Sequence, residues 1–128
     1  MGIVIISQQN SQHSQPVNIG TLDAMRSVMG DVFDELLGVF FEQSRAYMDE
    51  LNAAFSEKDF STLERIFHSM GSSSLSMGAH KLSELARSLE KRSIQAAALI
   101  TLDDINNLKD EYVLVEKAIK SLLDGEKN

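Results

Sequence analysis

Three histidines, His13, His68 and His80, are the side chains in this sequence most able to do chemistry. No two of them stand four residues apart, and neither a His-Glu-x-x-His nor a Glu-x-x-His motif occurs, which argues against zinc and di-iron sites. Without cysteine, the chain has no thiolate metal site, disulfide or cysteine nucleophile. Phosphate-binding Gly-x-x-x-x-Gly-Lys loops and Gly-x-Ser-x-Gly elbows are also absent. These absences favour a protein without metal, cofactor or enzymatic activity of its own.

One of these histidines, His68, falls on the exposed side of a predicted helix. That helix begins at Asp59 or Ser61 and has a stripe of apolar residues at helical spacing: Phe60, Leu63, Phe67, Met70 and Met77. At about 100° per residue, His68 lies about 130° from the centre of the stripe, so its side chain should point to solvent. Gly71, one turn later, should leave the surface beside the imidazole open. An exposed imidazole is mostly neutral and nucleophilic at pH 7, although position alone does not distinguish it from an ordinary surface histidine.

The other two histidines are interpreted as ordinary surface residues. His80 stands two residues before Leu82, on the side of its predicted helix opposite the apolar stripe. His13 belongs to a polar stretch of Gln, Ser and Asn that cannot bury enough apolar surface to fold alone. Neither pattern indicates a ligand site.

Helices on both sides of the His68 segment must position it. A short helix capped by Thr21 is predicted to end near Gly30, and a long helix carries one apolar stripe over residues 33–55. After a turn at Gly78, another helix runs from Ala79 into the mid-nineties.

The final helix shows the clearest periodicity. Thr101 and Asp104 resemble a capping box at its start. Apolar residues then follow at alternating steps of three and four: Ile105, Leu108, Tyr112, Val115, Ile119 and Leu122. Because the connections are short, consecutive helices should lie antiparallel. The sequence predicts an all-α fold, an antiparallel up-down-up-down four-helix bundle with an additional short N-terminal helix.

Composition limits the classes of function. The chain has 128 residues, 43% of them apolar, and a formal charge of −7, which describes one small acidic domain without the basic surface that nucleic acid requires. The apolar run Ile3–Ile6 is too short for a membrane span or a signal-peptide core, so we expect a cytoplasmic protein. We predict a polar N-terminal arm over residues 1–18, the helical domain over residues 19–124, a C-terminal tail over residues 125–128, and a monomer.

The segment from His68 to Glu90 resembles the central part of histidine-containing phosphotransfer (HPt) domains. In that family a phosphorylated histidine precedes a Gly-Ala turn by ten and eleven residues, and a Leu-rich helix ending in Leu-Glu follows. Gly78 and Ala79 stand at the turn positions. Further matching positions are Ser73, Ser74, Leu82, Leu85, Leu89 and Glu90. The resemblance extends over about residues 20 to 123 and favours His68 as a phosphoacceptor.

The sequence departs from the family at two positions, because Gly71 and Ser72 stand where the family usually has lysine and glycine. The lysine normally places a positive charge beside the phosphoryl group. If the helix that carries His68 and the helix that begins at Ala79 form an antiparallel hairpin with its turn at Gly78, residues near position 88 lie opposite His68. Three basic residues then come within reach as substitutes: Arg65, Arg87 and Lys91. Together with Gly71, Ser72 and the exposed Leu75, they form the predicted partner-binding surface.

The resemblance implies a phosphorelay carrier. His68 would accept a phosphoryl group from the aspartate of one receiver domain and pass it to another, with Nε2 as the attacking atom and Glu90 orienting the imidazole. The Mg²⁺ ion would belong to the receiver partner, since this family leaves the metal to the receiver. The alternative is a degenerate helical module that docks receiver domains or another partner without phosphotransfer.

Overall fold

The computed structural model describes residues 15–127, and all its regular elements are helices. They are α2 (Ile19–Met29), α3 (Val32–Ser56), α4 (Phe60–Ser76), α5 (His80–Ala96), the short 3₁₀ helix η1 (Ala97–Leu99) and α6 (Leu102–Lys127). No strand occurs in this part of the chain. The all-α prediction is therefore confirmed for the described residues.

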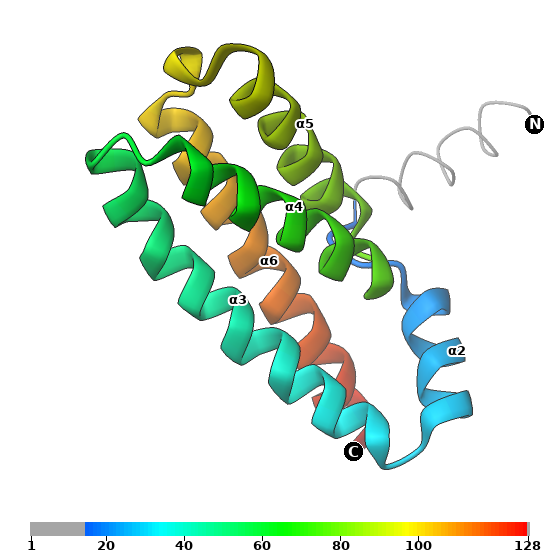
Figure 1. Ribbon diagram of the computed structural model, residues 1–128. Coiled ribbons are helices and arrows are strands. Elements are labelled where there is room, and N and C mark those ends of the chain that lie inside the picture. Colours follow the sequence, from blue (N-terminus) through cyan, green and yellow to red (C-terminus); the bar gives the residue numbers. More distant parts are fainter. Residues whose placement is uncertain (1–14, 128) are drawn as a thin grey trace, which may run out of the picture.

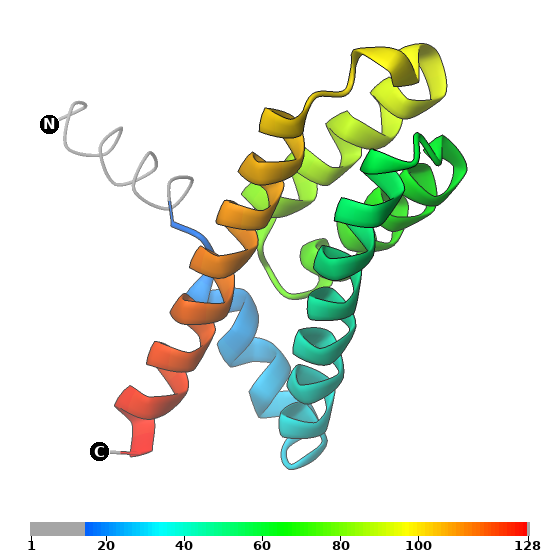
Figure 2. The ribbon, with the colours of Figure 1, turned by 90° about the vertical axis from the view of Figure 1, so that its left-hand side faces the viewer.

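The two longest helices, α3 and α6, extend along the whole length of the helical bundle (Figures 1 and 2). In both views, α4 and α5 lie against one half of this pair and the shorter α2 lies against the other half. The most extensive contact between helices joins α4 to α5. At their turn, the backbone N–H of Asn18 donates to the carbonyl of Gly78 over 2.8 Å, which joins the start of α2 to the α4–α5 connection.

Side-chain caps set the starts of three helices. Asp59 caps α4 by accepting from the backbone N–H of Thr62, which identifies Asp59 rather than Ser61 as the start. Asn18 caps α2 in the same way, so the prediction of a cap at Thr21 is wrong by one turn: Thr21 donates its backbone N–H to Asn18. The hydrogen bonds from Thr62 hold the pKa of Asp59 below its ordinary value.

The predicted capping box at the start of α6 is confirmed. The Thr101 N–H donates to the Asp104 carboxylate over 2.9 Å, and the Asp104 N–H donates to the Thr101 hydroxyl over 3.1 Å. Arg92 of α5 adds a bond of 2.8 Å to the same carboxylate. Burial alone would raise the pKa of Asp104, but the hydrogen bonds from Thr101 and the charge of Arg92 together lower it. The contact therefore joins the end of α5 to the start of α6.

The core consists of the apolar stripes that helical periodicity predicts. In α4, Leu63, Phe67 and Met70 are buried, and in α6 the predicted series is buried from Ile105 to Ile119, with Leu122 partly covered. No buried side-chain nitrogen or oxygen among the described residues lacks a hydrogen-bond partner. The closely packed stripes make α4 a rigid support for whatever its outer face presents.

The ends of the described chain extend the helical domain. Val17 is buried in the core, and Asn18 caps α2, so residues 17 and 18 of the predicted arm pack with the domain. At the other end α6 continues to Lys127, into the predicted tail. The rest of the arm, including Ile3–Ile6 and His13, lies outside the described residues, as does position 128. Among the described helices, none is both long enough and apolar enough to cross a membrane.

Candidate functional site

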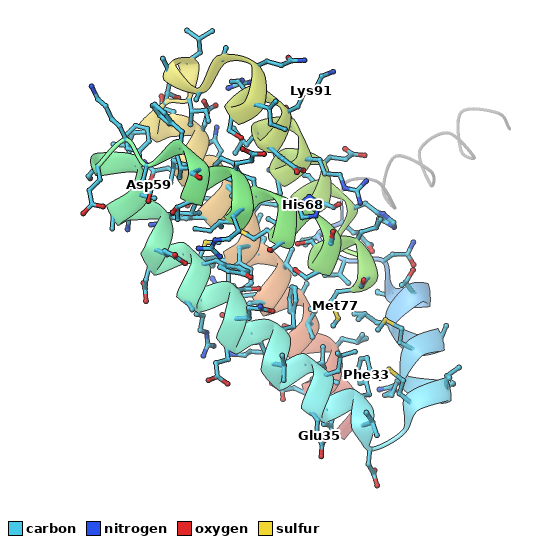
Figure 3. The ribbon with its side chains drawn as sticks, viewed as in Figure 1. Phe33, Glu35, Asp59, His68, Met77 and Lys91 are labelled. Carbon is cyan, nitrogen blue, oxygen red and sulfur yellow. The ribbon has the colours of Figure 1, made fainter. Side chains whose placement is uncertain are left out.

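His68 lies on the outer side of α4, next to α5 (Figure 3). Its side chain is 68% exposed, which confirms the prediction from helical phase. The preceding residues Ile66 and Phe67 are fully buried and anchor the backbone beneath it. The imidazole is therefore open to solvent on a helix turn that cannot easily move.

The carboxylate of Glu90 on α5 contacts the imidazole. Its Oε2 lies 2.7 Å from Nδ1 of His68, although the two residues are 22 positions apart in the chain. A carboxylate can only accept hydrogen bonds, so Nδ1 carries the proton in this contact. In the neutral imidazole, Nε2 then has a free lone pair and is the nucleophilic atom.

The register between α4 and α5 brings Glu90 to this position. The buried hydroxyl of Ser83 donates to the carbonyl of Gly71 over 2.7 Å, one turn beyond His68 on α4. Farther along α5, Ser93 donates to the carbonyl of Glu90 over 2.6 Å. Residue numbers rise along α4 as they fall along α5 between these two contacts, and His68 faces Glu90, two positions from the predicted residue 88.

A shallow depression of about 370 Å³ surrounds His68. It is lined by Ser61, Glu64, Arg65, His68, Ser69 and Glu90. The structure thus brings together three of the predicted site residues, His68, Glu90 and Arg65. Ser69 was not predicted, and its place next to His68 in the chain is the only sequence signal for it. The carboxylates of Glu64 and Glu90 make this depression rich in negative charge.

Arg65 is already engaged with another helix. Its guanidinium donates to Glu50 of α3 over 2.6 Å, and both side chains are about half exposed. Glu50 was not predicted, because nothing in the local sequence pattern shows where α3 crosses α4. This pair ties the positive charge of Arg65 to α3.

The surface at Gly71 differs from the prediction. Gly71 is buried instead of leaving an open space, because the side chain of Arg87 lies across it. A Cβ atom added at Gly71 would lie 2.9 Å from Cγ of Arg87. The physical reason is the close approach of α5, which helical phase within α4 alone cannot reveal.

The remaining predicted binding residues lie at the edges of this face. Ser72 and Leu75 are exposed on α4, and Leu75 has 42% of its surface open to solvent. Lys91 is exposed on α5, but it lies apart from His68 toward the Ala96 end of that helix (Figure 3). His80, interpreted from the sequence as a surface residue, is exposed at the start of α5. Within residues 15–127, no cluster of acidic or histidine side chains could hold a metal ion.

Comparison with known proteins agrees with this geometry. A comparison with curated protein sequences returns no match. The crystal structure of histidine-containing phosphotransfer protein B (HptB) from Pseudomonas aeruginosa PAO1 superimposes with a TM-score of 0.78 and 24% sequence identity, covering 84% of this chain and 94% of that chain. At this identity the match shows a shared fold. The family model named Hpt domain matches residues 35–124, which is more than half of the chain. This chain therefore belongs to the Hpt domain family.

Proposed function

We propose that this protein is a phosphorelay carrier in which His68 receives and donates the phosphoryl group. Nε2 attacks the phosphorus of an aspartyl phosphate on a receiver domain, a P–N bond forms, the P–O bond breaks, and the aspartate leaves as a carboxylate. The reverse step on another receiver returns the imidazole to its free state. The observation that carries this proposal is the 2.7 Å contact of Glu90 with Nδ1, which leaves Nε2 exposed as the nucleophile.

The carboxylate of Glu90 has a second role in this reaction. When Nε2 binds phosphorus, the imidazole ring becomes positively charged, because Nδ1 keeps its proton. A carboxylate at hydrogen-bond distance from Nδ1 stabilises that charge as it develops. Glu90 therefore acts as a positioning residue that also lowers the energy of the phosphorylated state.

The partner is proposed to be a receiver domain in the cytoplasm. Its Mg²⁺ ion and basic residue would supply most of the charge needed for in-line transfer, so the carrier needs no cofactor or kinase activity of its own. Docking would be transient, between monomers, over the depression at His68 and the exposed Ser72 and Leu75. The small side chains of Ser61 and Ser69 in the lining suit the approach of a partner active site.

The arrangement that presents this face is proposed to be the antiparallel up-down-up-down unit formed by α3, α4, α5 and α6, with α2 as an addition. The opposite directions of α4 and α5 support this topology. In this arrangement the reactive histidine lies on a helix flanked by two others, away from the turns. A rigid, central position limits the entropy lost when a partner docks.

The test is direct transfer from a phosphorylated receiver. The purified chain should acquire a label that is labile to acid and stable to base, as expected for phosphohistidine, and His68→Gln should abolish it. His80→Gln is the matched control, since His80 is an exposed histidine on the neighbouring helix and should leave labelling unchanged. Label that persists in His68→Gln would overturn the assignment. Binding of receivers without any label would instead support a docking module, which Gly71 at the usual lysine position favours.

A further inference from the structure

Gly71 and Arg87 fit each other closely across the α4–α5 contact. A Cβ atom at Gly71 would lie 2.9 Å from Cγ, 3.5 Å from Nε and 3.8 Å from Cδ of Arg87. The side chain of Arg87 therefore crosses the helix backbone where any larger residue would occupy its place. In its present conformation, Arg87 depends on glycine at position 71.

This crossing lies one helical turn from the candidate nucleophile on both helices. Gly71 follows His68 by three residues on α4, and Arg87 precedes Glu90 by three residues on α5. Residues three apart share one side of a helix. His68 contacts Glu90 and the carbonyl of Gly71 accepts from Ser83, so the side chain of Arg87 lies beside the turn of α4 that follows His68.

Arg87 is also a cation without an acidic partner in the described structure. No hydrogen bond or ion pair joins it to any residue in the range 15–127. Arg65, which lines the depression at His68, is paired with Glu50. A phosphoryl group on His68 would bring two negative charges close to Glu64 and Glu90, so a nearby unpaired guanidinium would offset a real repulsion.

We propose that Arg87 binds the phosphoryl oxygens on His68, and that Gly71 is the residue that makes room for it. This inference rests on the proposed function of His68. The guanidinium suits the task because its planar N–H donors match phosphate oxygens in a bidentate geometry. The positive charge thus reaches the phosphoryl group from α5, across the backbone of α4, instead of from a side chain on α4 itself.

The experiment measures the equilibrium distribution of label between a phosphorylated receiver and this protein, together with the transfer rate. Arg87→Ala should shift the equilibrium constant away from phospho-His68 by about tenfold, the size expected for one charge-assisted hydrogen bond. Arg87→Lys should keep part of the effect, because a point charge remains. Lys117→Ala is the matched control, because Lys117 is an exposed cation on α6, a helix that lines no part of the depression at His68, and it should change the constant less than about twofold.

A rescue variant separates a phosphoryl contact from a purely structural role. Gly71→Lys combined with Arg87→Ala removes the steric conflict and returns a cation from α4, so label on His68 should recover. Failure of this rescue in a variant with a normal melting temperature would contradict the inference. An unchanged equilibrium in Arg87→Ala would overturn it and leave the proposed function intact. Absence of label on the wild-type protein would overturn the proposed function itself.

Discussion

Glu90 and Glu116 are two carboxylates of similar exposure, 22% and 18%, in very different surroundings. Glu116 lies between α3 and α6, where its Oε1 contacts Arg45 at 2.5 Å, the hydroxyl of Tyr112 at 3.3 Å and Lys120 at 3.8 Å. Glu90 has one side-chain partner, the imidazole of His68. One carboxylate is surrounded by donors, and the other holds a single exposed ring.

Under the proposed function, the difference separates a contact that stabilises the fold from one that prepares a reaction. The donors around Glu116 are mostly cationic and join two helices, so their removal would leave charges unpaired. The partner of Glu90 is 68% exposed and keeps one nitrogen free, so its covalent state can change without disturbing the core. Burial alone would rank the two residues as equals, whereas the number and chemistry of their partners distinguish them.

The largest effect should come from removing the positioning carboxylate. Glu90→Ala frees the imidazole to rotate and removes the charge that stabilises the phosphorylated ring, so transfer to His68 should slow by about 10- to 100-fold. Rapid-quench measurement of label transfer would show this loss. Glu90→Gln is the matched variant, because its amide oxygen can still accept from Nδ1–H and should retain part of the rate. Equal transfer rates in Glu90→Ala and wild type would show that Glu90, like Glu116, has no role in the reaction.

The opposite pattern is expected at Glu116. Glu116→Ala should lower the free energy of unfolding by about 1 to 2 kcal/mol, because Arg45 and the hydroxyl of the buried Tyr112 lose their acceptor. Transfer to His68 should stay at the wild-type rate. Urea unfolding and the transfer assay on the same preparation measure both. A slower transfer without a loss of stability would show that the contacts of Glu116 between α3 and α6 affect the reactivity of His68.

A smaller effect, on the pH dependence of stability, should come from Tyr112, one of the partners of Glu116. Burial, followed by the charge and hydrogen bond of Glu116, raises the pKa of Tyr112 well above its ordinary value. The unfolded chain therefore releases the phenolic proton first, so this stabilisation is complete below about pH 10 and decreases as the pH rises above it.

Tyr112→Phe has no such proton, so its stability should fall less than that of wild type between about pH 8 and about pH 11. Urea unfolding of both proteins over this range measures the difference. Other groups that titrate in the range, such as lysines, are common to both proteins and cancel. Parallel pH profiles would mean that Tyr112 is as easily ionised in the folded state as in the unfolded one.

Much of the candidate site follows from local rules. Helical phase within α4 predicts the exposure of His68, and the hairpin turn at Gly78 brings the region of Glu90 opposite it. The caps at Asp59 and Thr101 also depend on residues within one turn. Such features can be predicted because helical periodicity and capping depend on nearest neighbours in the chain.

Apart from the cap of α2, which is Asn18 instead of Thr21, the features that were missed involve contacts between distant segments. The prediction placed open surface at Gly71, where Arg87 in fact lies, and it did not pair Arg65 with Glu50. Val17 stands in the stretch that was predicted to be a polar arm, but it is buried in the core. Each of these contacts depends on the distance between two packed segments, which the periodicity of the sequence does not predict.

By itself, the sequence determined an all-helical chain in which His68 is exposed within the segment that resembles Hpt domains. Only the tertiary structure decided which charges meet that histidine. Long side chains such as those of Arg65 and Arg87 can reach several partners, and the choice depends on the crossing of α3, α4 and α5. The apolar pattern that predicts each helix is a local property of the chain, whereas the electrostatic surroundings of His68 result from packing between helices.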